Sequence, residues 1–324
     1  MEQAVVKKGI SCVTAVYSAW DRMETILFRP FEIGKWFLLG FSAWLACIGQ
    51  GMGMNFNFPS IPDTSSQAGS AAKGDTVNVV NQLFPSDMFT GAFLVLLIAL
   101  LIAVIFISLV IVLILLWVRS RGAFVFLHDL ATGTTEVTRP WREFSRQGNS
   151  LFFFRIVCGL IMAAFLIILI ALTALMVFHS IKAGNLDAMG IGGIVFGVTS
   201  LLLVILTVIF LELSIDNFII PLMFRKRFPA WAALGEFISL VNMHPMAFAR
   251  FFLMYLLLSI CSAVAVAVFV FSTCCFCCIG LILLSLPYIW AVVTLPILTF
   301  FRLYGVEFLG QFGEEYRIMP PARP

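Results

Sequence analysis

Residues 251–301 read FFLMYLLLSICSAVAVAVFVFSTCCFCCIGLILLSLPYIWAVVTLPILTFF and contain no charged side chain. A single helix of this length would measure about 75 Å at roughly 1.5 Å per residue, whereas the hydrocarbon core of a bilayer is about 30 Å thick. We therefore expect the chain to cross the membrane, turn and cross back within this stretch. The sequence predicts an integral membrane protein built from helical hairpins.

The composition of the whole chain agrees with this interpretation. Of the 324 residues, 61% are hydrophobic and only 11% are charged. A soluble domain is about 45–50% apolar and about 25% charged, so this is the composition of a membrane protein. The net charge of +3 is too small to indicate nucleic acid as a partner.

Three further uncharged runs, 88–118, 156–181 and 188–211, each exceed the roughly 18 apolar residues that a helix needs to cross a bilayer. A weaker run begins near Ile33, so we expect six spans. The expected segments, in chain order, are an amphipathic helix at 10–32, a span at 33–54, an external loop at 55–87, a span at 88–118, a cytoplasmic connection at 119–150, spans at 151–181 and 190–222, a cytoplasmic amphipathic connection at 225–245, spans at 246–272 and 279–301, and a cytoplasmic tail at 302–324.

The basic residues predict the orientation of these spans. Six spans leave both termini on one side, and 18 of the 20 Lys and Arg residues fall in the segments of that side. Only Lys73 and Lys182 lie on the other side. Because connections rich in Lys and Arg stay in the cytoplasm, we expect both termini to be cytoplasmic.

An amphipathic segment precedes each odd-numbered span. These segments begin near Ala15, Pro140 and Phe228, and each combines Trp, Phe and charged residues. We therefore predict an all-α membrane protein of three helical hairpins, each preceded by an interfacial amphipathic helix. The alternative is that interfacial Trp, Phe and Arg recur here as they do in any multi-pass protein.

Glu212 and Asp216 are two acidic residues in the fourth predicted span, and Asn217 follows Asp216. A spacing of four residues puts both carboxylates on one face of the helix. Acidic residues inside a span face the bundle interior or a water-filled cavity, and they need a partner there.

The partners that we expect are Arg119 and Arg121. Aligning the repeat units at Phe124 and Phe218 puts both arginines at nearly the depth of the acidic pair. We predict an ion-pair cluster of these four side chains near the cytoplasmic leaflet. It either locks two repeats together or forms a site for a proton, an ion or a lipid headgroup.

Two sets of residues are candidates for ligand contacts. Prolines bend the last span, and bent helices line cavities, although packing is the simpler explanation. The candidate cavity-lining residues are Ser285, Pro287, Tyr288, Trp290, Thr294 and Pro296. Basic and amide side chains near the cytoplasmic interface could bind anionic headgroups, or they could be ordinary charges that set the topology. The candidate headgroup contacts are Arg142, Arg146, Asn149, Arg155, Asn242 and Arg250.

The run Cys274-Cys275-Phe276-Cys277-Cys278 falls at the expected external turn between the last two spans. Adjacent cysteines chelate one zinc ion poorly, so a tight turn of small residues is favoured over a disulfide or a metal site. No metal-binding motif and no Ser–His–Asp order with a glycine elbow is present in the sequence. We expect no metal, no cofactor and no catalytic residues.

Four segments together carry a family resemblance: LFRPFEIGKWFLLGFSAW, DNFIIPLMF, NMHPMAFARFF and TLPILTFFRLYGVEFLGQFG. With them the chain resembles uncharacterised six-span membrane proteins of bacteria and archaea. It is similar in layout to the membrane domain of some glycerophosphodiester phosphodiesterases. The resemblance implies a six-helix bundle in the prokaryotic inner membrane. It implies no activity, because none of these residues is catalytic and no phosphodiesterase domain is recognised in the 324 residues.

Three functions are consistent with these features. The first is a non-enzymatic protein that binds or moves membrane lipids or another amphipathic molecule, as a homo-oligomer. The second is a structural or accessory subunit that scaffolds a complex with a membrane-protein partner. The third is a small-ion channel or transporter that uses Glu212 and Asp216. An enzyme is the least favoured class.

Overall fold

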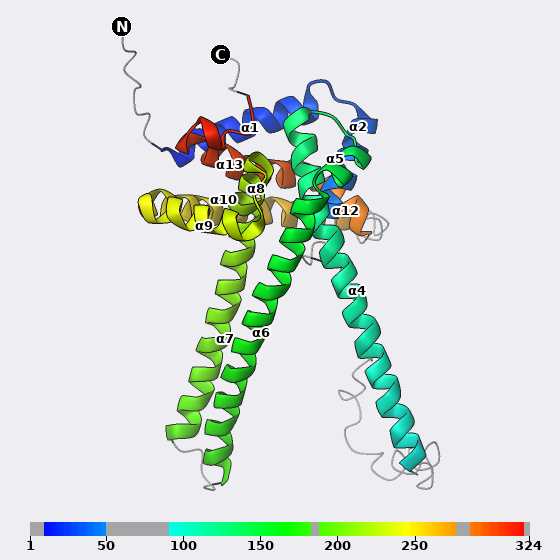
Figure 1. The fold of residues 1–324 in the computed structure, drawn as a ribbon, viewed down its shortest axis with the longest axis vertical. Helices are drawn as coiled ribbons and strands as arrows, with labels where there is room; N and C mark the ends of the chain where they lie inside the picture. Colours follow the sequence, from blue (N-terminus) through cyan, green and yellow to red (C-terminus); the bar gives the residue numbers. More distant parts are fainter. Residues whose placement is uncertain (1–9, 50–90, 183–187, 277–285, 321–324) are drawn as a thin grey trace.

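The computed structural model describes residues 10–49, 91–182, 188–276 and 286–320. This part of the chain is helical, and no strand occurs in it. Three long helices extend in one general direction from a head that holds the other described helices (Figure 1). The long helices are α4 (Gly91–Thr132), α6 (Ser145–Lys182) and α7 (Ala188–Ser214). The helices of the head are α1 (Cys12–Phe28), α2 (Ile33–Cys47), α5 (Thr138–Glu143), α8 (Ile220–Lys226), α9 (Ala230–Met243), α10 (Pro245–Phe276), α12 (Pro287–Val293) and α13 (Leu295–Leu309). A π-helical turn, η3 (Ile215–Ile219), joins α7 to α8, and the short 3-10 helices η4 (Gly310–Phe312) and η5 (Glu314–Tyr316) follow α13.

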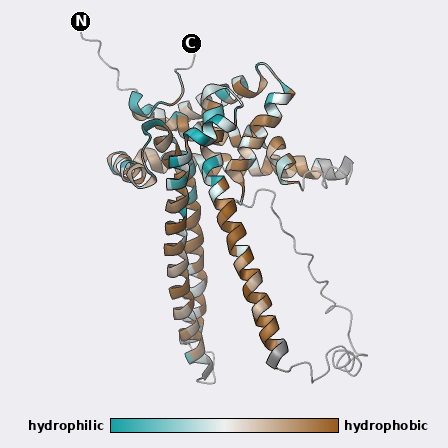
Figure 2. Ribbon diagram, turned by 45° about the vertical axis from the view of Figure 1, so that its right-hand side comes forward, coloured by the Kyte–Doolittle hydropathy of each residue, from teal (hydrophilic) through white to brown (hydrophobic). Residues whose placement is uncertain are grey.

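The long helices have the character of membrane spans. Their outer parts are mostly hydrophobic, whereas hydrophilic residues gather in the head (Figure 2). A helix that is apolar on all sides and exposed, as α4 is from Leu94 to Val112, belongs in lipid. The chain is therefore a helical, multi-pass membrane protein.

By length and composition, four of the described helices can cross a membrane, namely α4, α6, α7 with its continuation into α8, and α10. The bent pair α12–α13 would be a fifth. The first predicted span, 33–54, begins as helix α2, which has 15 residues where a crossing needs about 20. Six spans, three hairpins and cytoplasmic termini therefore stay predictions.

Helices α6 and α7 form the one hairpin whose long arms pack side by side in the described residues (Figure 1). Gly193 and Gly197 of α7, one turn apart, face Met176 and Thr173 of α6. A Cβ atom at Gly197 would lie 2.7 Å from the Thr173 methyl group. Glycines at this spacing let two membrane helices approach closely, so they explain why this pair stays together.

The last predicted span, 279–301, is bent, as its prolines predicted. Helices α12 and α13 meet at 66° around Thr294. Pro296 explains the bend, because it has no N–H to donate and its ring would clash with the carbonyl of Val292 in a straight helix. The preceding helix α10 lies in the head and does not run along α6 and α7 (Figures 1 and 2).

Aromatic rings from distant segments fill the core of the head. Phe218 of η3 lies 4.8 Å, between ring centroids, from Phe251 of α10. Phe251 in turn stacks on Tyr304 at 4.6 Å and contacts Phe308 at 4.7 Å. All four side chains are fully buried. This core holds α10 and α13 against the end of α7, where the candidate site lies.

The contact between α2 and α4 yields a stability prediction. A Cβ atom at Gly122 would lie within 2.7 Å of the backbone carbonyl of Leu45. Backbone cannot move aside as a flexible side chain can, so Gly122→Ala is expected to lower stability by about 1–3 kcal/mol. Gly159 of α6 has no atom within 4 Å of its added Cβ, so Gly159→Ala is the control. Thermal melting in detergent measures both, and equal melting temperatures would contradict the close packing.

Candidate functional site

Four charged side chains meet where α4, α6 and α7 enter the head. Arg119 of α4 contacts Glu212 of α7 at 2.5 Å and Asp216 of η3 at 3.7 Å. Arg155 of α6 contacts the same two carboxylates, Asp216 at 3.1 Å and Glu212 at 3.8 Å. Both arginine side chains are buried, and the carboxylates are partly exposed. We call these four residues the charge cluster; it ties three long helices together at one point.

The charge cluster contains Arg119, Glu212 and Asp216, which the sequence analysis grouped together, but not Arg121. Arg121 donates instead to Asn149 Oδ1 from Nη2 at 3.0 Å, and its guanidinium lies 4.3 Å from the ring centre of Trp117. The reason is helical geometry. Residues two apart point in directions about 200° apart, so Arg119 and Arg121 cannot face the same partner.

Arg155 takes the place that Arg121 was expected to fill. Arg155 was expected among the headgroup contacts, but its side chain is only 2% exposed and faces the two carboxylates. It reaches them because α6 packs between α4 and α7 at this level. A headgroup contact by Arg155 is therefore not compatible with this arrangement.

The π-helical turn η3 explains why a third arginine approaches Asp216. Ile220 donates its N–H to the carbonyl of Ile215, and the next residue, Pro221, has no N–H. In this π register the residue that would pair with the carbonyl of Asp216 is Pro221. Arg302 of α13 donates to this carbonyl through Nη1. A π turn inserted into an α-helix often marks a functional site.

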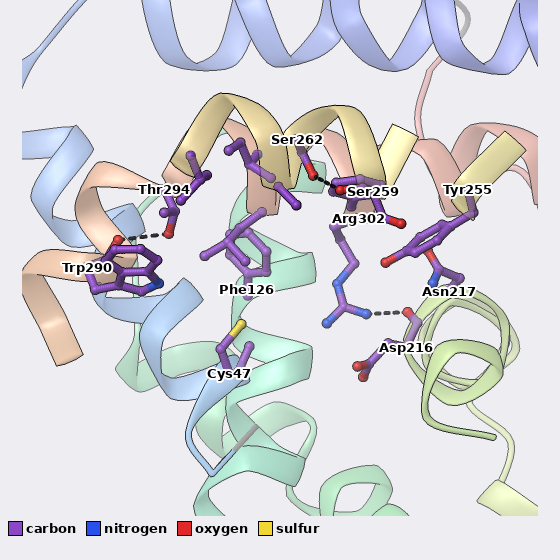
Figure 3. Close-up of a pocket in the computed structure, with 16 residues that line it drawn as sticks. Cys47, Phe126, Asp216, Asn217, Tyr255, Ser259, Ser262, Trp290, Thr294 and Arg302 are labelled. Atoms are coloured by element: carbon purple, nitrogen blue, oxygen red, sulfur yellow. Dashed lines mark hydrogen bonds between the residues drawn. The ribbon is translucent and has the colours of Figure 1, made fainter. Parts of the chain in front are cut away.

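Arg302 also lines a cavity of about 390 Å³, which we call the Arg302 cavity. Figure 3 shows its guanidinium and the Asp216 carboxylate at one end, and Trp290 and Thr294 at the other. Hydroxyl, amide and aromatic side chains surround the space between them. The complete lining is Ala46, Cys47, Phe126, Asp216, Asn217, Tyr255, Ser259, Ser262, Ala263, Val266, Trp290, Thr294, Ile297, Leu298, Phe301 and Arg302.

A second cavity of about 590 Å³ lies beside the first, and we call it the Trp20 cavity. Helices α1, α10 and α13 form its walls, which are almost entirely apolar. Its lining is Val16, Tyr17, Trp20, Met23, Leu258, Cys261, Ser262, Ala265, Pro296, Ile297, Phe300 and Phe301. Ser262, Ile297 and Phe301 line both cavities, so the two spaces adjoin.

The candidate cavity-lining residues from the sequence divide into three groups. Trp290 and Thr294 line the Arg302 cavity, and Pro296 lines the Trp20 cavity. Pro287 and Tyr288 line neither of these two cavities; the Tyr288 hydroxyl donates to the carbonyl of Phe37 at 2.9 Å. Ser285 lies outside the described residues.

The remaining candidate headgroup contacts are mostly exposed. Arg142, Arg146, Asn242 and Arg250 are exposed at the surface of the head, which leaves them free for such contacts. Asn149 is engaged, because its Oδ1 accepts from the Trp117 indole at 3.1 Å as well as from Arg121.

Asn217, beside the acidic pair, is buried. Its amide donates to the carbonyl of Leu213 at 2.9 Å, and it packs against Gly305 of α13. It therefore joins η3 to α13 next to Arg302.

No metal centre is found among the described residues, where no three His, Cys, Asp or Glu side chains are close enough to hold an ion. The side chains of the cysteine run Cys274–Cys278 lie outside the part that the structure describes.

Comparison with known proteins gives one family. A family of unknown function (DUF7544) matches residues 10–287, which is most of the chain. The chain belongs to this family. The matched residues include α1 to α10 and all four members of the charge cluster, whereas Arg302 lies beyond them. No curated protein and no solved structure matches the chain.

Proposed function

We propose that this chain is a non-enzymatic membrane protein that binds a lipid or another amphipathic molecule. The observation that supports the proposal is the pair of adjoining cavities. One has a guanidinium, a carboxylate and several hydroxyl groups in its wall, and the other is lined by apolar side chains. Both volumes lie within the roughly 300–1,000 Å³ of small-molecule sites. A molecule with a polar head and an apolar tail has the matching distribution of groups.

The charge cluster has a structural part in this proposal. Each carboxylate lies within 4 Å of two arginines, and the cluster joins three helices. Carboxylates held in this way favour locking of the long helices over carrying an ion through the membrane. The cluster thus fixes α7 and η3, and η3 fixes the Arg302 end of the cavity.

The proposed oligomeric state, membrane and orientation rest on the sequence. We propose that the protein acts as a homo-oligomer in a prokaryotic inner membrane, with both termini in the cytoplasm. Movement of the bound molecule between leaflets would follow if the two cavities open to lipid.

Native mass spectrometry of the protein, released gently from its own membrane, tests the proposal. We expect phospholipid to stay bound at about one molecule per chain, because the two cavities adjoin at three shared lining residues. Liquid-chromatography mass spectrometry of the extracted lipid identifies it.

Two results would overturn the proposal. The first is a chain that carries no lipid under gentle release. The second is a stoichiometric membrane-protein partner without specific lipid, which would favour a scaffolding subunit instead.

A further inference from the structure

We propose that the bound molecule carries an anionic, phosphate-type head, and that Arg302 recognises it in the Arg302 cavity. This inference rests on the proposed lipid-binding function and names the class of ligand. The ligand's phosphate group would lie beside Arg302. Its acyl chain would pass between Ser262 and Phe301 into the Trp20 cavity.

The charge balance around the Arg302 cavity is positive. Arg119, Arg155 and Arg302 face only two carboxylates among the described residues, those of Glu212 and Asp216. The carboxylates are already engaged by Arg119 and Arg155. An anion beside Arg302 would balance the remaining charge.

The arginines also have more donors than the described acceptors use. The Nε atoms of Arg119 and Arg155 and Nη1 of Arg155 are buried without a hydrogen-bond partner. Buried N–H groups without acceptors are unfavourable by about 1–3 kcal/mol each, more when charged. Neither arginine lines the Arg302 cavity, so an anion there would interact with their charge but would not accept from these N–H groups.

Arg302 itself is held in a position to donate. The bond from its Nη1 to the Asp216 carbonyl fixes the guanidinium, and Nε and Nη2 remain for a ligand. Tyr255 lines the Arg302 end of the same cavity (Figure 3), and its hydroxyl would serve another oxygen of a phosphate or glycerol group. Arginine binds phosphate through two parallel N–H groups, which makes this contact selective for an anion.

Lipid titration by native mass spectrometry in detergent tests the inference with three ligands. Phosphatidylglycerol and phosphatidylcholine of identical acyl chains separate an anionic from a zwitterionic head, and glycerol 3-phosphate separates a lipid from a free phosphate ester. We expect phosphatidylglycerol to bind about tenfold or more tightly than phosphatidylcholine, because charge-assisted hydrogen bonds contribute about 1.5–3 kcal/mol.

Arg302→Gln is the variant that should abolish this preference. Glutamine keeps an amide donor for the Asp216 carbonyl and removes the positive charge. Arg225→Gln makes the same charge change at an exposed position of α8, outside both cavities, and is expected to keep the preference.

The possible results separate this inference from the proposed function. If the wild-type chain binds the two lipids equally, the inference of an anionic head group is overturned, whereas the proposed lipid binding stands. This comparison requires no variant. Binding of neither lipid overturns both proposals. Tight binding of glycerol 3-phosphate without lipid would identify a soluble phosphate ester as the ligand. It would overturn the proposal that an acyl chain occupies the Trp20 cavity. If Arg302→Gln still prefers phosphatidylglycerol over phosphatidylcholine, Arg302 does not recognise the head group.

Discussion

Arg155→Met is expected to lower the free energy of unfolding by about 3–5 kcal/mol. Removing one arginine leaves a single buried arginine, Arg119, to balance two carboxylates of the cluster, and breaking a buried ion pair in this way is far more costly than replacing the whole pair. Asp216 would lose its 3.1 Å contact with Arg155. Thermal melting and unfolding in a denaturing detergent measure the loss. Arg146→Met, at an exposed position of the same helix, is the control and is expected to melt like the wild type.

A second variant tests the reason for this loss. Adding Asp216→Asn to Arg155→Met removes the uncompensated carboxylate, so the double variant should recover part of the stability. If Arg155→Met melts at the wild-type temperature while lipid retention disappears, the cluster is functional and its structural role is refuted. If stability and lipid retention fall together and the double variant recovers both, locking of the helices is supported.

The membrane character and the long helices were predictable from the sequence because they depend on local composition. Uncharged runs such as 88–118 and 156–181 are too long and too apolar for anything but spans. These uncharged runs do not predict how the helices pack against one another. The bend at Thr294 was predictable from Pro296, but the position of α10 in the head was not. That position depends on contacts between distant segments and on an aromatic core that no periodicity reveals.

The charge cluster was partly predictable for a similar reason. Glu212 and Asp216 share one helical face by their spacing, and internal alignment brought Arg119 to their depth. The same alignment could not choose between Arg119 and Arg121, although their separation of two residues excludes that both face one partner. Arg155 was placed by the packing of α6, which the alignment did not include.

Arg302 was missed because its position depends on a backbone defect in another helix. The sequence does hold a signal: Arg302 ends the uncharged stretch 251–301, where a charge needs a partner. Pro221 gives an incomplete signal, because in a regular α-helix its missing N–H affects the carbonyl of Asn217, and only the π turn transfers this effect to Asp216. Only the fold brings these two observations together.

Ser262→Trp is expected to reduce lipid retention by tenfold or more. Ser262 lines both cavities, so an indole at this position would fill space where the proposed lipid passes from one to the other. The hydroxyl donates only to the carbonyl of Ser259 within the same helix at 2.9 Å, so its removal alone changes little. Native mass spectrometry with phosphatidylglycerol measures the retained lipid.

Ser272→Trp is the matched control for this variant. Ser272 lies on the same helix α10, is exposed, lines neither cavity, and has an equivalent hydrogen bond to the carbonyl of Val268. Overpacking by tryptophan can lower stability by about 1–3 kcal/mol, so melting temperatures are measured for both variants, and Ser262→Leu provides a smaller obstruction. If Ser262→Trp and Ser262→Leu both fold and keep their lipid as Ser272→Trp does, the lipid does not occupy the two cavities. The exposed surfaces of α4 and the α6–α7 hairpin would then be the place to search for it.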